Sequence, residues 1–191
     1  MQSEQVRTRL LRAYPSQLRQ EVEEVLQIIP ADERTVGDLS PVKVKNETLY
    51  IPMRVYFEDI NEVAIPNLTP KQKAIMGSLY TRHHNGFVRE KWLRQIIEME
   101  EYWLPAFVLQ LMGEYVLEII SVLAENESAL KKEPYSRFIQ ENLEFDFCTT
   151  QRILSYWNVY YRWRTPHYKD HLPYKLAKNI GLWRLKPARK N

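Results

Sequence analysis

Glycine and cysteine are scarce in this sequence. Five glycines in 191 residues leave few positions for strained turns or for glycine-rich loops that cradle phosphates. A single cysteine, Cys148, excludes an internal disulfide framework, and its place in the run Phe-Asp-Phe-Cys predicts a small buried side chain. These two shortages exclude a disulfide-stapled scaffold and disfavour a nucleotide-binding loop.

The short motifs of common enzymes are also missing. The chain has no Gly-x-Ser-x-Gly, no P-loop, no Gly-x-Gly-x-x-Gly and no His-Glu-x-x-His. Many active sites leave no local signature, so this absence does not exclude catalysis. The sequence therefore leans away from an enzyme and predicts no cofactor.

Targeting and membrane signals are lacking as well. Residues 1–7 contain no apolar signal core, which predicts a cytoplasmic location. The most apolar stretch, residues 103–124, contains two carboxylates, and these exclude a simple membrane span. We expect a cytoplasmic chain that does not cross a membrane.

What the sequence does contain is typical of one globular domain. Hydrophobic residues make up 45% and charged residues 27%, and no change of composition marks a boundary within residues 1–191. Residues 185–191 form a short basic tail that we expect to be flexible. The sequence predicts a single domain and leaves the oligomeric state open.

Hydrophobic periodicity predicts a mainly α fold, either a compact helical bundle or a short helical stack. Thr69-Pro70 is typical of a helix start, with Thr as N-cap and Pro at the first helical position. A β-hairpin is expected near residues 42–57, and Pro52 indicates that it lies at an edge or packs on helices. The expected helices cover residues 4–13, 16–29, 70–83, 87–97, 103–124, 135–143 and 145–163.

A line of polar residues runs through the predicted central helix 103–124. Gln110, Glu114 and Glu118 are spaced by four, which places them on one side of a helix. Two carboxylates one turn apart are able to bind a metal or to serve as acid and base. A narrow solvent-facing edge, or ion pairs to Arg or Lys of a neighbouring helix, explains the same pattern, and the chain has no Glu-x-x-His pair.

The four histidines form two pairs in the sequence. His83 and His84 end a helix, where neighbouring side chains diverge, and a histidine there suits the helix dipole. His167 and His171 are spaced by four but are bracketed by prolines, which leaves no room for a long helix. We predict no metal site.

Charge is distributed very unevenly along the chain. Residues 1–151 carry 17 Lys and Arg against 23 Asp and Glu, a balance of −6. Residues 152–191 carry 10 Lys and Arg against one Asp, a balance of +9, and the two parts sum to the overall charge of +3. The basic end is therefore the strongest pointer to a partner.

Aromatic residues are interleaved with the cations of this basic end. Cations neutralise phosphates and rings stack on unpaired bases, so the composition suits nucleic acid; it suits an acidic protein or the acidic body of this chain equally well. The helical part, residues 156–163, is more typical of a core than of a stacking platform. We predict a partner-binding region that contains Arg162, Arg164, Lys169, Lys175, Lys178, Trp183, Arg184, Lys186, Arg189 and Lys190.

Residues 74–97 resemble a HEAT-type helical repeat. Such a repeat has an apolar first helix, a turn with Asp or Asn, and a Val-Arg pair that opens the second helix. The matching positions are Asn85, Val88, Arg89, Leu93 and Ile96. The resemblance implies a stacked helix pair, a common base for binding surfaces, and it implies no chemistry.

Three functions follow from these observations. The first is a non-catalytic interaction or scaffold protein that binds a protein partner through the basic, aromatic end. The second is a nucleic-acid-binding protein that uses the same region. The third is an enzyme or metal protein centred on Glu114 and Glu118.

Overall fold

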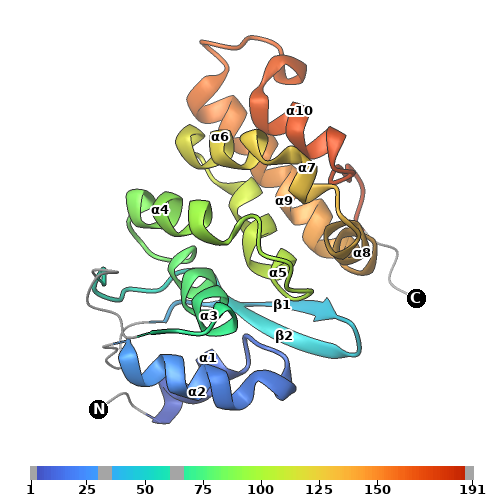
Figure 1. Cartoon of the computed structure of the whole chain (residues 1–191). Helices are drawn as coiled ribbons and strands as arrows, with labels where there is room; N and C mark the ends of the chain where they lie inside the picture. The colour runs from blue at the N-terminus through green and yellow to red at the C-terminus, as the bar shows by residue number, and fades with distance from the viewer. Residues whose placement is uncertain (1–3, 30–35, 61–66, 188–191) are drawn as a thin grey trace.

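The computed structural model describes residues 4–29, 36–60 and 67–187, and it confirms a mainly α chain with a β-hairpin (Figure 1). No helix in the described part is long and apolar enough to cross a membrane. Short 3-10 helices are η1 (Ser16–Leu18), η3 (Leu109–Gly113) and η5 (Tyr168–Asp170), and η4 (Trp157–Tyr161) is a π-helix. The α-helices and strands are α1 (Glu4–Leu11), α2 (Arg19–Ile28), β1 (Leu39–Val44), β2 (Glu47–Pro52), α3 (Pro70–Tyr80), α4 (Gly86–Ile96), α5 (Pro105–Val108), α6 (Leu117–Glu125), α7 (Glu127–Leu130), α8 (Glu133–Glu141), α9 (Leu143–Tyr156) and α10 (Leu172–Asn179).

The elements follow the chain from one end of the molecule to the other. Helices α1 and α2, the hairpin and α3 lie at the end near the N-terminus, and α6, α9 and α10 lie at the opposite end (Figure 1). Helix α5 lies between them and packs on both α3 and α8. One continuous hydrophobic core runs through the described chain, so the expectation of a compact helical body is confirmed.

Tyr14 fastens the first two helices to the centre of the molecule. Its ring stacks on Phe107, with 5.1 Å between ring centroids, and meets Trp103 edge-on. Its hydroxyl lies 2.9 Å from the carbonyl oxygen of Ile75 and 2.7 Å from Ser78 Oγ. A buried hydroxyl needs such partners, and these two hold the α1–α2 turn against α3.

The hairpin is shorter than predicted. Val44 pairs with Glu47 across a turn of Lys45 and Asn46, and Lys45 has a φ of 53°. The second strand ends at Pro52, whereas the predicted hairpin extended to residue 57. The chain beyond it turns to pair with the end of α3 instead, where Val55 N–H donates to the carbonyl of Arg82 at 2.8 Å.

Helices α3 and α4 begin where the sequence predicts. Thr69 caps α3 through a reciprocal capping box with Gln72, and Asn85 Oδ1 accepts the Phe87 N–H to cap α4 at 3.0 Å. The two helices touch at Gly77, where a Cβ atom would lie 2.3 Å from Ile96 Cγ2. Glycine is needed at that contact because no side chain fits.

The prediction of one continuous helix over residues 103–124 is wrong. The chain forms α5 and the 3-10 helix η3, passes through an extended Glu114 with φ −99° and ψ 156°, and becomes helical again in α6. Residues 114–116 supply the turn that separates η3 from α6. Gln110, Glu114 and Glu118 therefore do not share one helical face.

Candidate functional site

A group of exposed aromatic rings lies where α9 continues into the π-helix η4. Trp163 is 81% exposed, Tyr160 49% and Tyr115 48%. The ring centroids of Tyr115 and Tyr160 are 5.6 Å apart, and Tyr156 lies within 6.0 Å of both. We call the exposed Tyr115, Tyr160 and Trp163, together with the half-buried Tyr156, the aromatic face.

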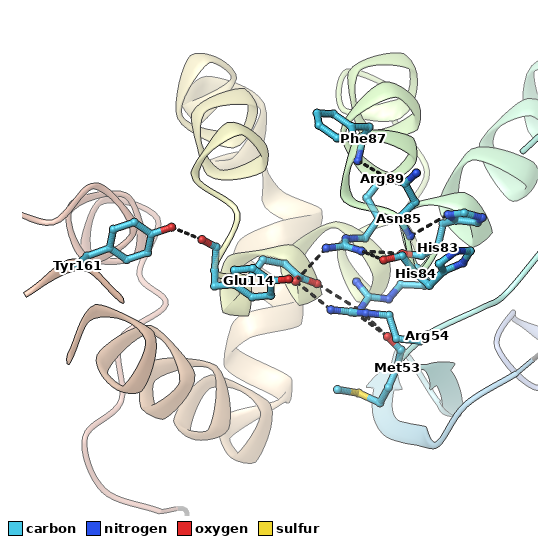
Figure 2. Close-up of polar contacts among 11 residues, drawn as sticks. Met53, Arg54, His83, His84, Asn85, Phe87, Arg89, Glu114 and Tyr161 are labelled. Atoms are coloured by element: carbon cyan, nitrogen blue, oxygen red, sulfur yellow. Dashed lines mark hydrogen bonds and ion pairs between the residues drawn. The ribbon is translucent and has the colours of Figure 1, made fainter. Parts of the chain in front are cut away.

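Two side-chain polar atoms of this region are hydrogen-bonded within the chain. Trp163 Nε1 donates to the carbonyl of Tyr160 at 2.9 Å, and the Tyr161 hydroxyl donates to the carbonyl of Tyr115. Figure 2 shows Tyr161 reaching the backbone beside Glu114. These bonds hold the rings in place while the face of the Trp163 indole stays open to solvent. The expectation that residues 156–163 resemble a core is wrong, because no residue of η4 is buried.

The predicted cations lie at different distances from the aromatic face along the chain. Arg162 and Arg164 are exposed and flank Trp163 directly, and the Arg162 guanidinium lies 5.7 Å from the Trp157 ring centroid. Arg189 and Lys190 lie outside the described residues. Of the other exposed cations, Lys169 lies on η5, Lys175 and Lys178 lie on α10, and Lys186 lies near the end of the described chain.

The rest of the predicted region packs against its own chain. Tyr168, Tyr174 and Trp183 form a second ring cluster, in which Tyr174 meets Trp183 edge-on at 4.7 Å. Arg184 N–H donates to Thr150 Oγ1 at 3.0 Å, and the Arg184 guanidinium lies 3.9 Å from Asp146. Trp183 thus packs on rings of η5 and α10, and Arg184 joins the end of the chain to α9.

Glu114 is buried and bound to arginines. Its carboxylate is 2.9 Å from Arg54 Nη2, 3.4 Å from Arg89 Nη2 and 3.9 Å from Arg82 Nη2. Figure 2 shows the two closest guanidinium groups, those of Arg54 and Arg89, converging on it. Glu118, in contrast, is exposed on α6. Of the alternatives for this polar line, ion pairing applies to Glu114 and solvent exposure to Glu118.

This arrangement is unfavourable for a metal at Glu114, because three neighbouring cations repel a divalent ion. Among the described residues, no group of three or more His, Cys, Asp or Glu side chains is placed to hold a metal. His83 uses both ring nitrogens: Nε2 lies 2.8 Å from the Phe57 carbonyl oxygen, and Nδ1 accepts the Asn85 N–H at 3.0 Å.

Two expectations about single side chains fail. The rings of His83 and His84 do not diverge, since their centroids are only 4.2 Å apart. Cys148 is half-buried on α9 with its Sγ 3.7 Å from Glu144 Oε1, whereas the sequence predicted a buried side chain. His84 is exposed and Cys148 is half-buried, and near the surface local sequence does not determine side-chain direction.

Sequence reasoning allowed for ion pairs at Glu114 but did not identify the arginines that form them. They come from the loop after β2, the end of α3 and α4, which are separated by up to 35 residues in the chain. A carboxylate within an apolar stretch was the available signal, because a buried charge requires partners of opposite sign. That signal does not say which of the many arginines supply the partners.

No protein-family model, curated protein or solved structure matches this chain. The resemblance of residues 74–97 to a HEAT-type repeat therefore stays a prediction, although α3 and α4 do pack as neighbouring helices. The candidate site rests on geometry and charge alone.

Proposed function

We propose that this protein is a cytoplasmic, non-catalytic interaction module that binds an acidic protein partner through the aromatic face. The observation that carries the proposal is the exposure of Trp163, 81%, beside Tyr160 and between Arg162 and Arg164. Trp, Tyr and Arg are the residues most enriched at the energetic centres of protein interfaces. An indole that is this exposed buries little apolar area in the fold, so its burial remains available for a partner.

The surrounding charge favours an acidic partner. Arg162, Arg164, Lys169, Lys175 and Lys178 are all exposed in a stretch that holds Asp170 as its only carboxylate. Asp170 is itself 3.9 Å from Lys175, which leaves the other cations to act on solvent or on a partner. The positive electrostatic field of these cations increases the association rate with a surface of opposite charge, and this effect weakens as the salt concentration rises.

The same residues could contact nucleic acid, and one neighbour favours a protein. Val159, which precedes Tyr160, is 62% exposed. An aliphatic side chain neither stacks on bases nor neutralises phosphate, whereas a protein interface buries it with gain. We therefore treat nucleic-acid binding as an outcome of the test.

The test uses the immobilised full chain in three forms. These are the wild type, a double variant with Tyr160→Ser and Trp163→Ser, and a control with Phe87→Ser on α4. Phe87 is also 81% exposed, so the control removes an equally exposed ring outside the aromatic face. Proteins retained from a cell extract are quantified at low and at high salt, and labelled single- and double-stranded nucleic acid is titrated in parallel.

We expect an acidic protein that binds the wild type and the Phe87→Ser control, is released by salt, and is reduced at least about tenfold by the double variant. Equal capture on all three forms contradicts the proposal. Micromolar binding of nucleic acid that weakens with salt and is lost in the double variant replaces it with the nucleic-acid alternative.

A further inference from the structure

The carboxylate of Glu114 is outnumbered by the cations that surround it. Arg54, Arg82 and Arg89 place a guanidinium nitrogen within 4 Å of it, at 2.9, 3.9 and 3.4 Å. The side chains of Arg82, Arg89 and Glu114 are each no more than 3% exposed. One buried carboxylate thus faces three guanidinium groups.

A fourth arginine lies next to this group. Arg152 of α9 packs on Gly113, the residue before Glu114, so that a Cβ atom on Gly113 would lie 3.0 Å from Arg152 Cδ and 3.5 Å from Nη1. The charge of Arg152 also reaches Arg82, whose pKa it lowers. We call Arg54, Arg82, Arg89 and Arg152 the arginine cluster.

The arginine cluster has a large excess of positive charge. Four cations and one carboxylate give a local balance of +3, and none of the four forms an ion pair with another carboxylate in the described part of the chain. Burying like charges together costs free energy unless an anion compensates them. An additional anion would therefore reduce the excess positive charge of the arginine cluster.

Two donors of the cluster have no acceptor. Arg82 Nη1 and Arg89 Nε are buried and find no hydrogen-bond partner among the described residues. The other nitrogens of Arg82 are used, since Nε donates to the Pro52 carbonyl at 3.1 Å and Nη2 to the Met53 carbonyl at 3.0 Å. Buried donors are rarely left unsatisfied in native proteins, and an unmet one is a reason to look for a ligand.

The protonation of Arg82 reflects the same imbalance. Burial lowers its pKa to about 9; Glu114 raises it in part, and the charges of Arg54, Arg89 and Arg152 lower it further. Burial lowers the pKa of Arg89 as well, with Glu114 again opposing the effect. A second anion beside Glu114 would favour the charged form of both groups.

We propose that the arginine cluster binds a small dianion of the phosphate class beside Glu114. Guanidinium forks match phosphate oxygens, and a dianion reduces the local balance from +3 to +1, whereas a monoanion leaves +2. The Arg54 side chain is 30% exposed, which gives the cluster contact with solvent. This proposal is independent of the aromatic face and of the proposed function.

The test measures phosphate binding to the full chain by thermal unfolding and by phosphorus NMR line broadening. The probes are inorganic phosphate and phosphoserine, each compared with chloride at matched ionic strength. The variants are Arg152→Gln and Arg54→Gln, whose side chains are partly exposed and tolerate change best. The control is Arg137→Gln on α8, an exposed arginine that pairs with Glu133 of its own helix.

We expect a saturable rise in Tm of about 5–10 °C at a phosphate concentration one hundred times Kd. Both cluster variants weaken binding at least about tenfold, and the Arg137→Gln control binds like the wild type. Equal affinity for both probes identifies the free ion as ligand, and tighter phosphoserine binding identifies a phosphate monoester. Identical Tm and line widths in phosphate and chloride, or unchanged binding by Arg152→Gln and Arg54→Gln, would refute the site.

Discussion

His83 and His171 are buried imidazoles, and burial lowers the pKa of each below its ordinary value of 6.5. In the unfolded chain both rings take up a proton near pH 6.5, whereas the folded protein resists protonation until a lower pH. The unfolded state therefore binds more protons in this range, and the free energy of unfolding falls as the pH falls below about 6.5. Above that pH the contribution of both groups is fully present.

The change His171→Gln removes one of these contributions. Between pH 7.5 and pH 5.5 we expect the free energy of unfolding to fall by up to about 1.4 kcal/mol more in the wild type than in this variant. The reason is that His171 of the wild type takes up a proton more readily in the unfolded state than in the folded state. Urea unfolding at the two pH values measures the difference. His167→Gln is the matched control, because it removes an exposed histidine four positions away. The prediction is wrong if His171→Gln keeps the full wild-type loss.

Asn142 joins the hairpin to the C-terminal helices. Its Oδ1 accepts the Lys43 N–H at 2.6 Å, and its Nδ2 donates to the Lys43 carbonyl at 2.8 Å and to the Phe138 carbonyl at 2.8 Å. The amide thus occupies the open edge of β1 as a neighbouring strand would, and it satisfies backbone groups that are otherwise unpaired.

Replacing Asn142 with Ala should therefore destabilise the protein by about 1–3 kcal/mol, because partly buried backbone groups lose their partners. Chemical denaturation measures this change. Asn158→Ala serves as control, because Asn158 is exposed and accepts one bond from Arg162; we expect less than about 0.5 kcal/mol there. A loss at Asn142 no greater than in the control would show that the edge contact does not stabilise the hairpin.

Local sequence predicted the elements well where the signal itself is local. Thr69 caps α3 as expected, because a cap is a contact between residues only a few positions apart. Asn85, which the sequence placed in the turn between the two helices, caps α4 in the same local way. The predicted helix 103–124 failed because its break depends on distant residues. Glu114 leaves the helical conformation at the point where it reaches Arg54 and Arg89, and nothing in the adjacent sequence reveals those partners.

Over the whole molecule, the acidic body and the basic end were visible in the sequence, but the exposure of the rings was not. Tyr160 on the π-helix and Trp163 just after it are exposed, while Trp183 packs against the core, although all three occur in similar surroundings of Arg, Lys and Tyr. Composition gives the charge of a surface; the tertiary contacts of each ring decide whether it is open to a partner. The arginine cluster illustrates the same limit, because its members converge only in the folded chain.

Glu114 connects the two ends of the molecule. Through Arg54 and Arg89 it ties the loop after the hairpin and helix α4 to the turn that precedes α6 (Figure 2). Arg82 adds the turn after α3 to the same carboxylate. Removing this one carboxylate charge leaves the buried guanidinium groups without compensation. Breaking a buried pair from one side typically costs about 3–5 kcal/mol, much more than the loss of an exposed charge.

We therefore expect Glu114→Gln to lower the free energy of unfolding by about 3–5 kcal/mol, and Glu118→Gln to change it by less than about 0.5 kcal/mol. The two residues are four positions apart and of the same type, so the pair isolates the effect of burial. Urea unfolding followed by far-UV circular dichroism measures both variants under the same conditions. If the free energy of unfolding falls equally little at the two positions, the buried guanidinium groups do not need the charge of Glu114 for their compensation. Another anion then already compensates them.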